Sequence, residues 1–333
     1  MKLYNVAVVG ATGAVGEEMA RILEERDFPI NKLSLFASHR SAGREHYFKN
    51  EKIEVMELRD DSFQGIDIAL FSGGDEVSKY FAPLAAQAGA IVIDNGKFYR
   101  MDPDVPLIIP EVNPGDIRKH KGIIANPNCS TTQMVVALKP IYDAVGIKNV
   151  ICATYQSVSG TGKEAIVELK EQSKAFLEGD NIDINVYPHQ IAFNVLPQIG
   201  SIDETGYSSE EVKMHEETRK ILNDYSINVS ATTVRVPVFR SHAEDIHIET
   251  REEISPEKAR ELFAEFSGVE VIDQPYESKY PLSLMAEGKD EVFVGRIRKD
   301  IVFNPGLAMW VVSDNLIKGA ALNTIQIAEL LIK

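Results

Sequence analysis

Cysteine is scarce in this sequence: only Cys129 and Cys152 occur among 333 residues. Two cysteines cannot build the disulfide framework of a small secreted domain, so we expect a reducing, cytoplasmic environment. Neither belongs to a Cys-x-x-Cys pair or to a cluster of cysteines and histidines. The sequence therefore predicts no structural zinc site and no other metal site.

Positive charge is also in short supply, since 35 lysines and arginines face 50 aspartates and glutamates, for a formal net charge of −15. This balance argues against nucleic acid or an anionic membrane as a partner, but it leaves open a locally basic pocket for a small-molecule anionic substrate. Residues 1–10 hold one positive charge and a short apolar run before glycines and acids, which fits neither a signal peptide nor a membrane span. The length indicates two domains.

The N-terminal segment has the parts of a dinucleotide-binding unit. An apolar strand is expected at 6–9, a glycine turn at 10–16 and a helix at 17–25. Small residues in such a turn let a pyrophosphate approach the amides of a helix N-terminus. The spacing is GxxGxxG rather than GxGxxG, so the pattern alone is weak, and its place directly after the first strand is what favours a cofactor. The candidate contacts are Gly10, Thr12, Gly13, Ala14 and Val15.

The end of the next expected strand, 32–37, suggests which dinucleotide binds. An NAD site usually has an acid here for the ribose 2′-hydroxyl. This sequence instead offers Ser38, Arg40 and Ser41, and hydroxyls with a guanidinium suit a 2′-phosphate. A solvated basic loop is the other interpretation. We expect NADP.

Further βα alternation predicts a Rossmann-like domain with a parallel sheet. Strands are expected at 66–71, 90–94 and 123–125, and a helix at 76–88. Ser72 and Gly73 follow one of these strands and form a second loop where a cofactor can approach.

Cys129 is the candidate nucleophile. It follows Asn126-Pro127-Asn128 and precedes Ser130-Thr131-Thr132 and an apolar helical run. A thiol at the start of a helix lies near unpaired amides and the positive end of the helix dipole, which favour the thiolate. Cys152 lies within an apolar strand and is the candidate core residue.

The second half of the chain predicts an α+β domain with a mixed sheet. Its expected strands alternate apolar and polar residues, which is typical of a sheet with one open face, and such a face is a plausible dimer surface. The expected strands are 150–158, 233–239, 245–250, 291–298 and 307–313; the expected helices are 163–177, 208–222, 256–266 and 317–331.

Local context leaves several polar residues in this half open to two interpretations. His242 stands where a strand gives way to a turn, a common place for a catalytic residue, but a loop histidine is more often a solvated one. Gln156 is either a satisfied core amide or a group that orients a reacting carbonyl. Glu210 and Lys213 suit a surface ion pair at i,i+3, and Arg235 alternates with valines as an exposed strand arginine would.

Five segments taken together resemble the aspartate-β-semialdehyde dehydrogenase family, and the likeness runs from Asn5 to the C-terminus. The glycine loop is generic, whereas the Cys129 segment and the spacing of seven between Arg235 and His242 are specific. The segments are Gly10–Gly16, Asn126–Thr131, Ser157–Gly162, Arg235–Val238 through His242, and Asp314–Asn323.

The resemblance implies a role for each candidate. Cys129 would attack the aldehyde carbon, Gln156 would position the thiohemiacetal and His242 would act as general acid/base. Backbone N–H groups at the Asn128–Cys129 turn would hold the oxyanion. Hydride would pass to NADP, and inorganic phosphate would attack the resulting thioester; the biosynthetic direction reverses these steps. The resemblance also assigns Arg235 to the substrate α-carboxylate, Glu210 to its amino group, Arg100 and Lys213 to phosphate, and Ser72, Gly73, Ser159, Gly160 and Asn315 to the cofactor.

The same resemblance implies an NADP-binding domain of residues 1–128, to which a helix at 315–333 returns, and a catalytic and dimerisation domain of residues 129–314, hence a homodimer. Two rivals remain open. N-acetyl-γ-glutamyl-phosphate reductase shares the chemistry but has no use for an acid such as Glu210, because its substrate amine is acetylated. A nucleotide-sensing relative without activity would be expected to have lost one of the three catalytic positions.

Overall fold

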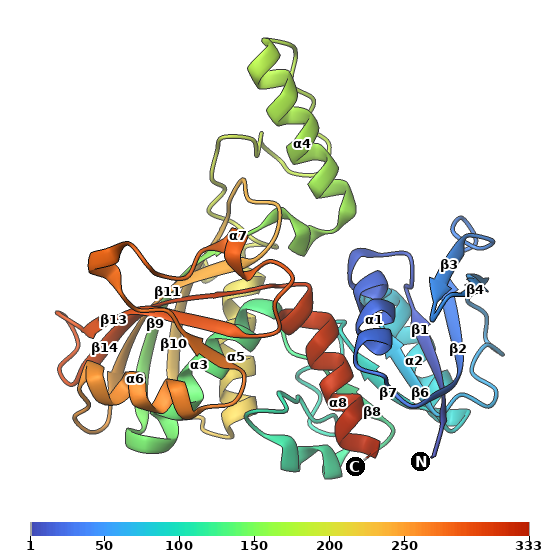
Figure 1. The fold of residues 1–333 in the computed structure, drawn as a ribbon, viewed down its shortest axis with the longest axis horizontal. Coiled ribbons are helices and arrows are strands. Elements are labelled where there is room, and N and C mark those ends of the chain that lie inside the picture. Colours follow the sequence, from blue (N-terminus) through green and yellow to red (C-terminus); the bar gives the residue numbers. More distant parts are fainter. Residues whose placement is uncertain (1, 333) are drawn as a thin grey trace. The chain divides into compact units, whose positions relative to one another are not determined.

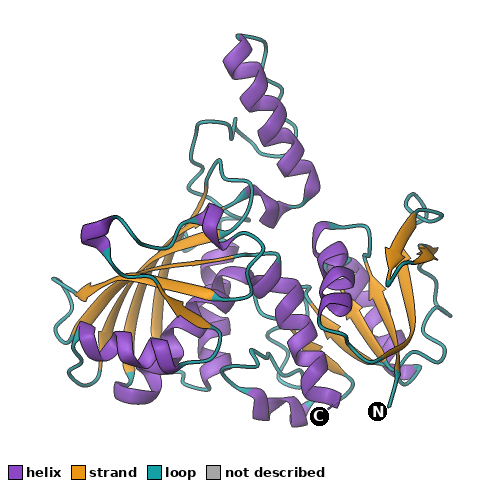
Figure 2. Cartoon of the chain, in the orientation of Figure 1, coloured by secondary structure: helices purple, strands orange, loops and turns teal. Residues whose placement is uncertain are grey.

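The computed structural model describes residues 2–332, and the chain forms two units (Figures 1 and 2). The first unit contains the chain up to Asn128 together with the residues from Ala320 onward, and the second contains Cys129–Gly319. Each unit is built around its own six-stranded sheet. Within residues 2–332, no helix combines the length and apolar character that crossing a bilayer requires.

The sheet of the first unit is entirely parallel, in the order β5-β2-β1-β6-β7-β8. Its strands are β1 (Tyr4–Val9), β2 (Ile30–Ala37), β5 (Met56–Glu57), β6 (Ile68–Phe71), β7 (Ile91–Asp94) and β8 (Ile123–Ala125). All of β6 is buried, as expected for a strand covered on both faces. Since β2 lies on one side of β1 and β6 on the other, the carboxyl end of β1 is the switch point where such sheets bind ligands.

The helices of this unit are α1 (Ala14–Glu25), α2 (Asp75–Gln87) and α8 (Leu322–Ile332), with a 3₁₀ turn at Pro114–Lys119. Helix α8 packs on α1 and β7 although it comes from the end of the chain. The Asn323 side chain joins it to the sheet by donating to the Asn126 side-chain oxygen (2.7 Å) and to the Ile108 carbonyl (3.0 Å). A hairpin of β3 (Glu45–Phe48) and β4 (Glu51–Glu54) lies apart from the main sheet.

The sheet of the second unit is mixed, in the order β10-β9-β11-β14-β13-β12. Its strands are β9 (Ile147–Gln156), β10 (Asn228–Arg235), β11 (His242–Thr250), β12 (Val269–Val271), β13 (Val292–Lys299) and β14 (Gly306–Ser313). β9 and β10 are parallel, whereas β11 is antiparallel to both β9 and β14. The carboxyl ends of β9, β10 and β14 and the start of β11 therefore meet at one end of the sheet.

The two faces of this sheet differ as the alternation predicted. Along β9, Cys152, Thr154 and Gln156 are buried while Ile151 and Tyr155 are 47% and 40% exposed. Helix α3 (Cys129–Val145) lies across the buried face between α5 (Ser209–Leu222) and α6 (Pro256–Glu265). The opposite face carries Tyr155 beside Trp310, with ring centroids 5.4 Å apart, and the short helix α7 (Ser283–Ala286) packs on part of it.

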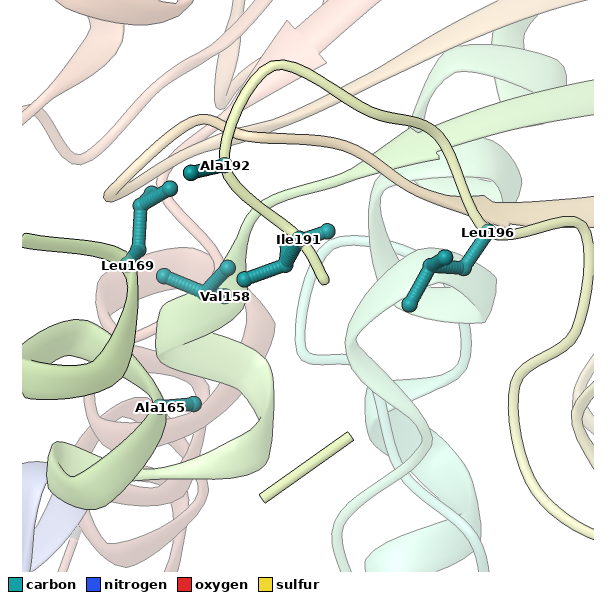
Figure 3. Packing of buried hydrophobic residues seen from close by; sticks show 6 residues of the cluster. All are labelled: Val158, Ala165, Leu169, Ile191, Ala192 and Leu196. Atoms are coloured by element: carbon teal, nitrogen blue, oxygen red, sulfur yellow. The ribbon is translucent and has the colours of Figure 1, made fainter. Parts of the chain in front are cut away.

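Helix α4 (Lys163–Glu178) extends away from this sheet (Figure 1). Its base is held by a small apolar cluster, which Figure 3 shows between the start of α4, the turn before it and the chain near residue 191. The buried members are Val158, Ala165, Leu169, Ile191, Ala192 and Leu196. A short helix, α7 (Ser283–Ala286), completes the unit.

Most element positions follow the hydrophobic periodicity, with several exceptions. The short elements β5, β12 and α7 were not predicted. The strand expected at 233–239 runs instead from Asn228 to Arg235, because Pro237 and the turn before His242 leave the sheet. The helix expected at 317–331 begins with a π-helical turn, Ile317–Ala321, before α8. The hairpin β3–β4 was not predicted, since its strands are polar and carry little apolar alternation.

Candidate active site

Cys129 is the first residue of α3, as the sequence predicts. The helix behind it is almost wholly buried, from Ser130 through Leu138, whereas Cys129 itself is partly exposed. The π-helical turn packs closely against it: a Cβ added to Gly319 would lie 2.7 Å from the Cys129 Cβ. The thiol is thus at a helix start with one side accessible and one side fixed. Cys152 is buried as predicted, and burial raises the pKa of its thiol.

A row of polar side chains crosses the end of the second sheet on the face that α3 covers. Arg235 on β10 pairs with Gln156 on β9, and His242 on β11 pairs with Ser313 on β14. All four are at most 5% exposed. The sequence placed Arg235 and His242 in exposed positions on local grounds, and both interpretations are wrong, because the helices bury this face of the sheet.

The His242 ring is held in one tautomer. The backbone N–H of Ser157 donates to Nδ1 at 3.1 Å, and a nitrogen that accepts a hydrogen bond in this way carries no proton. The proton of the neutral ring is therefore on Nε2, which has no protein partner within residues 2–332. Burial, with the nearby Arg235 guanidinium, lowers the pKa of His242 to about 3. At neutral pH the ring is an uncharged donor aimed through Nε2.

Asn315 joins three loops beside this histidine. Its Oδ1 accepts from the Ser157 and Ser159 hydroxyls, both at 3.1 Å, and from the Ser241 backbone N–H at 3.0 Å. These bonds fix the segment before α4 and the turn before β11 around one amide. Sequence reasoning gave Asn315 a cofactor role from the resemblance alone and missed Ser157, for which no local signal exists.

The Arg235 guanidinium is anchored by one end. Its Nη1 donates to the Ser157 carbonyl at 2.6 Å, and its buried Nε has no partner within the described chain. Gly160 leaves room between the Arg235 and His242 side chains: a Cβ there would lie 3.1 Å from the Arg235 Nη1 and 3.2 Å from the His242 Nε2. The arrangement suits a planar anion that reaches the remaining guanidinium N–H groups.

Glu210 and Lys213 form an ion pair of 2.9 Å on α5. The pair lies at i,i+3 as predicted, yet the Glu210 side chain is only 7% exposed, so the interpretation as a solvated surface pair is wrong. The amide of Gln156 approaches the other Glu210 oxygen at 3.5 Å and Thr154 at 3.3 Å. One carboxylate thus connects Gln156 in the sheet to the ammonium of Lys213.

The glycine loop of the first unit fits a dinucleotide. A Cβ on Gly10, which has φ +83°, would lie 2.8 Å from the backbone of Ser72, and one on Gly16 would lie 2.2 Å from the Gly10 oxygen. No side chain caps α1 at Gly13, so the amides of its first turn face outward for a pyrophosphate. Thr12, Ala14 and Val15 belong to the same loop and first turn, and Gly73 follows Ser72 beside it.

Three further candidates lie in the first unit. Ser38, Arg40 and Ser41 form a turn directly after β2, in which the Ser41 N–H donates to the Ser38 carbonyl at 2.8 Å and Arg40 is exposed. Arg100 is buried and donates to the Asn95 carbonyl at 2.8 Å. Asn128 is buried immediately before Cys129. Across residues 2–332 no set of three or more His, Cys, Asp or Glu side chains is arranged to hold a metal ion.

Comparison with known proteins identifies the family. Residues 5–120 match the model of the semialdehyde dehydrogenase NAD binding domain, and residues 138–318 match that of the semialdehyde dehydrogenase dimerisation domain. An aspartate-semialdehyde dehydrogenase from Aquifex aeolicus is 59% identical, over 99% of this chain and 98% of that protein.

Solved structures agree. Aspartate semialdehyde dehydrogenase II from Vibrio cholerae, complexed with ASA, is 49% identical with a TM-score of 0.97. The match covers 100% of this chain and 99% of the Vibrio cholerae chain. The Candida albicans enzyme with NADP is 28% identical with a TM-score of 0.78, over 99% of both chains. The two family models and these whole-length relatives show that the chain belongs to the aspartate-semialdehyde dehydrogenase family.

Proposed function

We propose that this chain catalyses the NADP-dependent reductive dephosphorylation of L-4-aspartyl phosphate to L-aspartate 4-semialdehyde. The step feeds the synthesis of lysine, threonine, methionine and isoleucine. The observation that carries the proposal is the buried row Arg235, Gln156 and His242, beside Glu210, in the unit whose first helix begins at Cys129. It combines an anion site, an acid for an amine and a hydrogen-bond donor for an oxyanion.

Cys129 is the proposed nucleophile in both directions. Its thiolate attacks the acyl phosphate carbon, the C–O bond to phosphate breaks, and phosphate leaves with the electron pair of that bond and takes up a proton. The product is a thioester on Cys129. NADPH, when bound, supplies the hydride that reduces this thioester. The C–S bond of the resulting tetrahedral species then breaks, which releases the aldehyde and restores the thiolate.

His242 is the proposed acid/base residue, and its tautomer favours the acid role. Since Nδ1 accepts from Ser157, Nε2–H is the donor available to the oxygen that becomes negative in the tetrahedral species. Backbone N–H groups at the Asn128–Cys129 turn are the proposed second donor. Loss of one such donor typically costs about 10²- to 10³-fold in kcat. Gln156 is proposed to position the same species.

Arg235 and Glu210 are the proposed anchors of the amino acid end of the substrate. A buried guanidinium with N–H groups left to donate suits the α-carboxylate, and a buried carboxylate suits an α-ammonium group. Lys213 and Arg100 are the proposed partners of the phosphate. A buried acid at 210 disfavours an N-acetylated substrate, because the acetamide brings no charge to pair with it, and this separates the proposal from N-acetyl-γ-glutamyl-phosphate reductase activity.

For the cofactor we propose the residues that the family resemblance assigns. Gly10, Thr12, Gly13, Ala14, Val15, Ser72 and Gly73 are proposed for the pyrophosphate and its surroundings; Ser38, Arg40 and Ser41 for the 2′-phosphate; and Ser159, Gly160 and Asn315 for the nicotinamide end. The proposed division of labour assigns residues 1–128 and 315–333 to NADP, and 129–314 to catalysis and to dimerisation. A cytoplasmic homodimer completes the proposal, because the dimerisation model matches and both cysteines are thiols.

The test follows NADP reduction at saturating aldehyde with and without inorganic phosphate. We expect turnover with aspartate semialdehyde to require phosphate and to exceed turnover with N-acetylglutamate semialdehyde, and NADP to exceed NAD. Cys129→Ser should abolish turnover and leave NADP binding by the protein nearly unchanged. Substantial activity in Cys129→Ser, or preference for the acetylated aldehyde, contradicts the proposal; NADP binding with no turnover on any semialdehyde would support a sensing protein instead.

A further inference from the structure

A second polar group lies one row behind the catalytic row on the same face of the second sheet. Glu244 is two residues after His242 on β11, so both side chains point to the face that α3 covers. Its cross-strand neighbours are Thr154 on β9 and Val311 on β14. Glu244 is 0% exposed. The chemistry proposed above gives this residue no part.

Neither carboxyl oxygen of Glu244 has a partner with hydrogen-bond geometry within residues 2–332. The Gln133 side-chain amide lies near enough to favour a negative charge on Glu244, but burial outweighs it. The groups that face it are Gln133 from α3, Thr154 and the Cys152 thiol from β9, and His242 from its own strand, and the ring of His242 is neutral. An unpaired buried carboxylate costs several kcal/mol. Burial therefore raises the pKa of Glu244 far above its ordinary value of 4.5.

A neutral carboxyl group is a donor, and Gln133 is the acceptor that fits. The Gln133 Oε1 accepts from the Ser313 hydroxyl at 2.7 Å, while its Nε2 is buried without a partner in the described chain. A half-turn of this amide exchanges the two atoms. Nε2 then donates to the Ser313 oxygen, and Oε1 accepts the Glu244 O–H. In this arrangement Glu244, Gln133 and Ser313 are all satisfied, with the proton of Glu244 as the donor to Gln133.

We propose that Glu244 is a positioning residue: it stays protonated in the folded protein and, through Gln133, fixes the first turn of α3 against the strands that carry His242 and Ser313. Gln133 is one helical turn after Cys129, and its backbone N–H is the helix partner of the Cys129 carbonyl. Ser313 is the cross-strand neighbour of His242. A single chain of hydrogen bonds thus relates the helix of the nucleophile to the strand of the acid/base. Only the catalytic consequence rests on the proposed function.

The protonation state is tested without any assay of activity. Infrared difference spectra of wild type and Glu244→Gln should show the C=O stretch of a protonated carboxyl in the wild type alone at neutral pH. The control is Glu168→Gln, because the Glu168 carboxylate accepts backbone N–H groups of Asn185 (2.8 Å) and Val186 (2.6 Å) and should contribute no such band. A wild-type spectrum that equals that of Glu244→Gln overturns the proposal.

Stability supplies a second readout with a fixed sign. The folded wild type holds a proton that the unfolded chain releases above pH 4.5, so its folding equilibrium constant should fall relative to that of Glu244→Gln by about tenfold per pH unit. The difference between the two proteins should level off as the pH is lowered below 4.5. A difference that is independent of pH above 4.5, or a wild type that loses stability relative to Glu244→Gln toward acid, contradicts the inference.

The positioning role is tested by the rate at which iodoacetamide alkylates Cys129, followed by mass spectrometry, together with kcat and KM. Glu244→Leu removes the donor and should lower kcat at least tenfold, with a changed alkylation rate and little change in KM, whereas Glu244→Gln should restore both. Gln133→Leu should match Glu244→Leu, and the double variant should add little. Equal loss in Glu244→Gln and Glu244→Leu overturns the role. If the leucine variants do not fold, Glu244→Ala replaces them. A wild-type alkylation rate of Cys129 together with a wild-type kcat in Glu244→Ala would overturn the role.

Discussion

Gly319→Ala tests whether the π-helical turn beside Cys129 positions the nucleophile. Gly319 donates its N–H to the Asp314 carbonyl five residues earlier, at 3.2 Å. A Cβ at 319 would lie 2.7 Å from the Cys129 Cβ and 3.1 Å from its Cα, whereas carbon atoms in contact prefer about 3.5 to 4.0 Å. The turn or the start of α3 must therefore move by on the order of 1 Å.

The expected cost follows from that displacement. Misplacing a reacting group by ~1 Å can lower the rate about 10²-fold, and overpacking a buried contact destabilises by about 1 to 3 kcal/mol. We expect kcat to fall about 10²-fold with a small change in KM. The free energy of unfolding should fall by about 1 to 3 kcal/mol, measured by thermal unfolding. The assay follows NADPH absorbance, with the alkylation rate of Cys129 measured in parallel.

Gly115→Ala is the matched control, because a Cβ at Gly115 meets nothing within 4 Å. It should leave kcat and the alkylation rate unchanged. A Gly319→Ala protein that keeps kcat within about twofold of wild type would refute the reasoning, since a shift that small implies no displacement of the sulfur.

Three further predictions concern the charged groups. The pKa of His242 is lowered from 6.5 to about 3, so kcat/KM should show no inflection near pH 6.5. Below pH 6.5 the unfolded chain binds a proton at this histidine and the folded protein does not, so wild type should lose stability relative to His242→Gln by about 1.4 kcal/mol per pH unit. An equal dependence of the unfolding free energy on pH in both proteins would contradict this. Arg235→Lys keeps the charge but loses the planar donor set, and kcat/KM should fall by at least about 10²-fold, measured with aspartate semialdehyde. Arg40→Ala should shrink the preference for NADPH over NADH by about 10- to 100-fold, measured as a ratio of kcat/KM values, with Lys49→Ala on the neighbouring hairpin as an unaffected control.

The fold was predictable where burial leaves a local pattern. Val6–Val9 and Ile68–Phe71 are apolar throughout because their sheet is covered on both faces, and β9 alternates because its sheet is covered on one. The hairpin β3–β4 has no such cover, so its sequence carries no comparable signal. The π-helical turn at Ile317 was not predicted either; its Gly319 lies against Cys129, 190 positions earlier in the chain, and local sequence does not report that contact.

The site was predictable at Cys129 and not at its neighbours. The residues around Cys129 predict the start of a helix, so the position of Cys129 on α3 follows from local sequence. The burial of Arg235 and His242 depends on α3 and α5 packing across the sheet, which no local alternation reports. Glu244 is a further example, because a glutamate in a strand is predicted to be exposed unless the helix that covers it is known. For Arg235 and His242 the family resemblance, not the spacing, supplied the prediction.

In the proposed reaction the Cys129 sulfur carries an acyl group between hydride transfer and phosphate. The most direct measurement is mass spectrometry of the intact protein and of the Cys129 peptide after incubation with aspartate semialdehyde and NADP in the absence of phosphate. We expect an aspartyl adduct on Cys129 that forms with reduction of NADP, disappears on addition of phosphate, and is absent in Cys129→Ser. Reduction of NADP without any adduct, or an adduct on another residue, would contradict it.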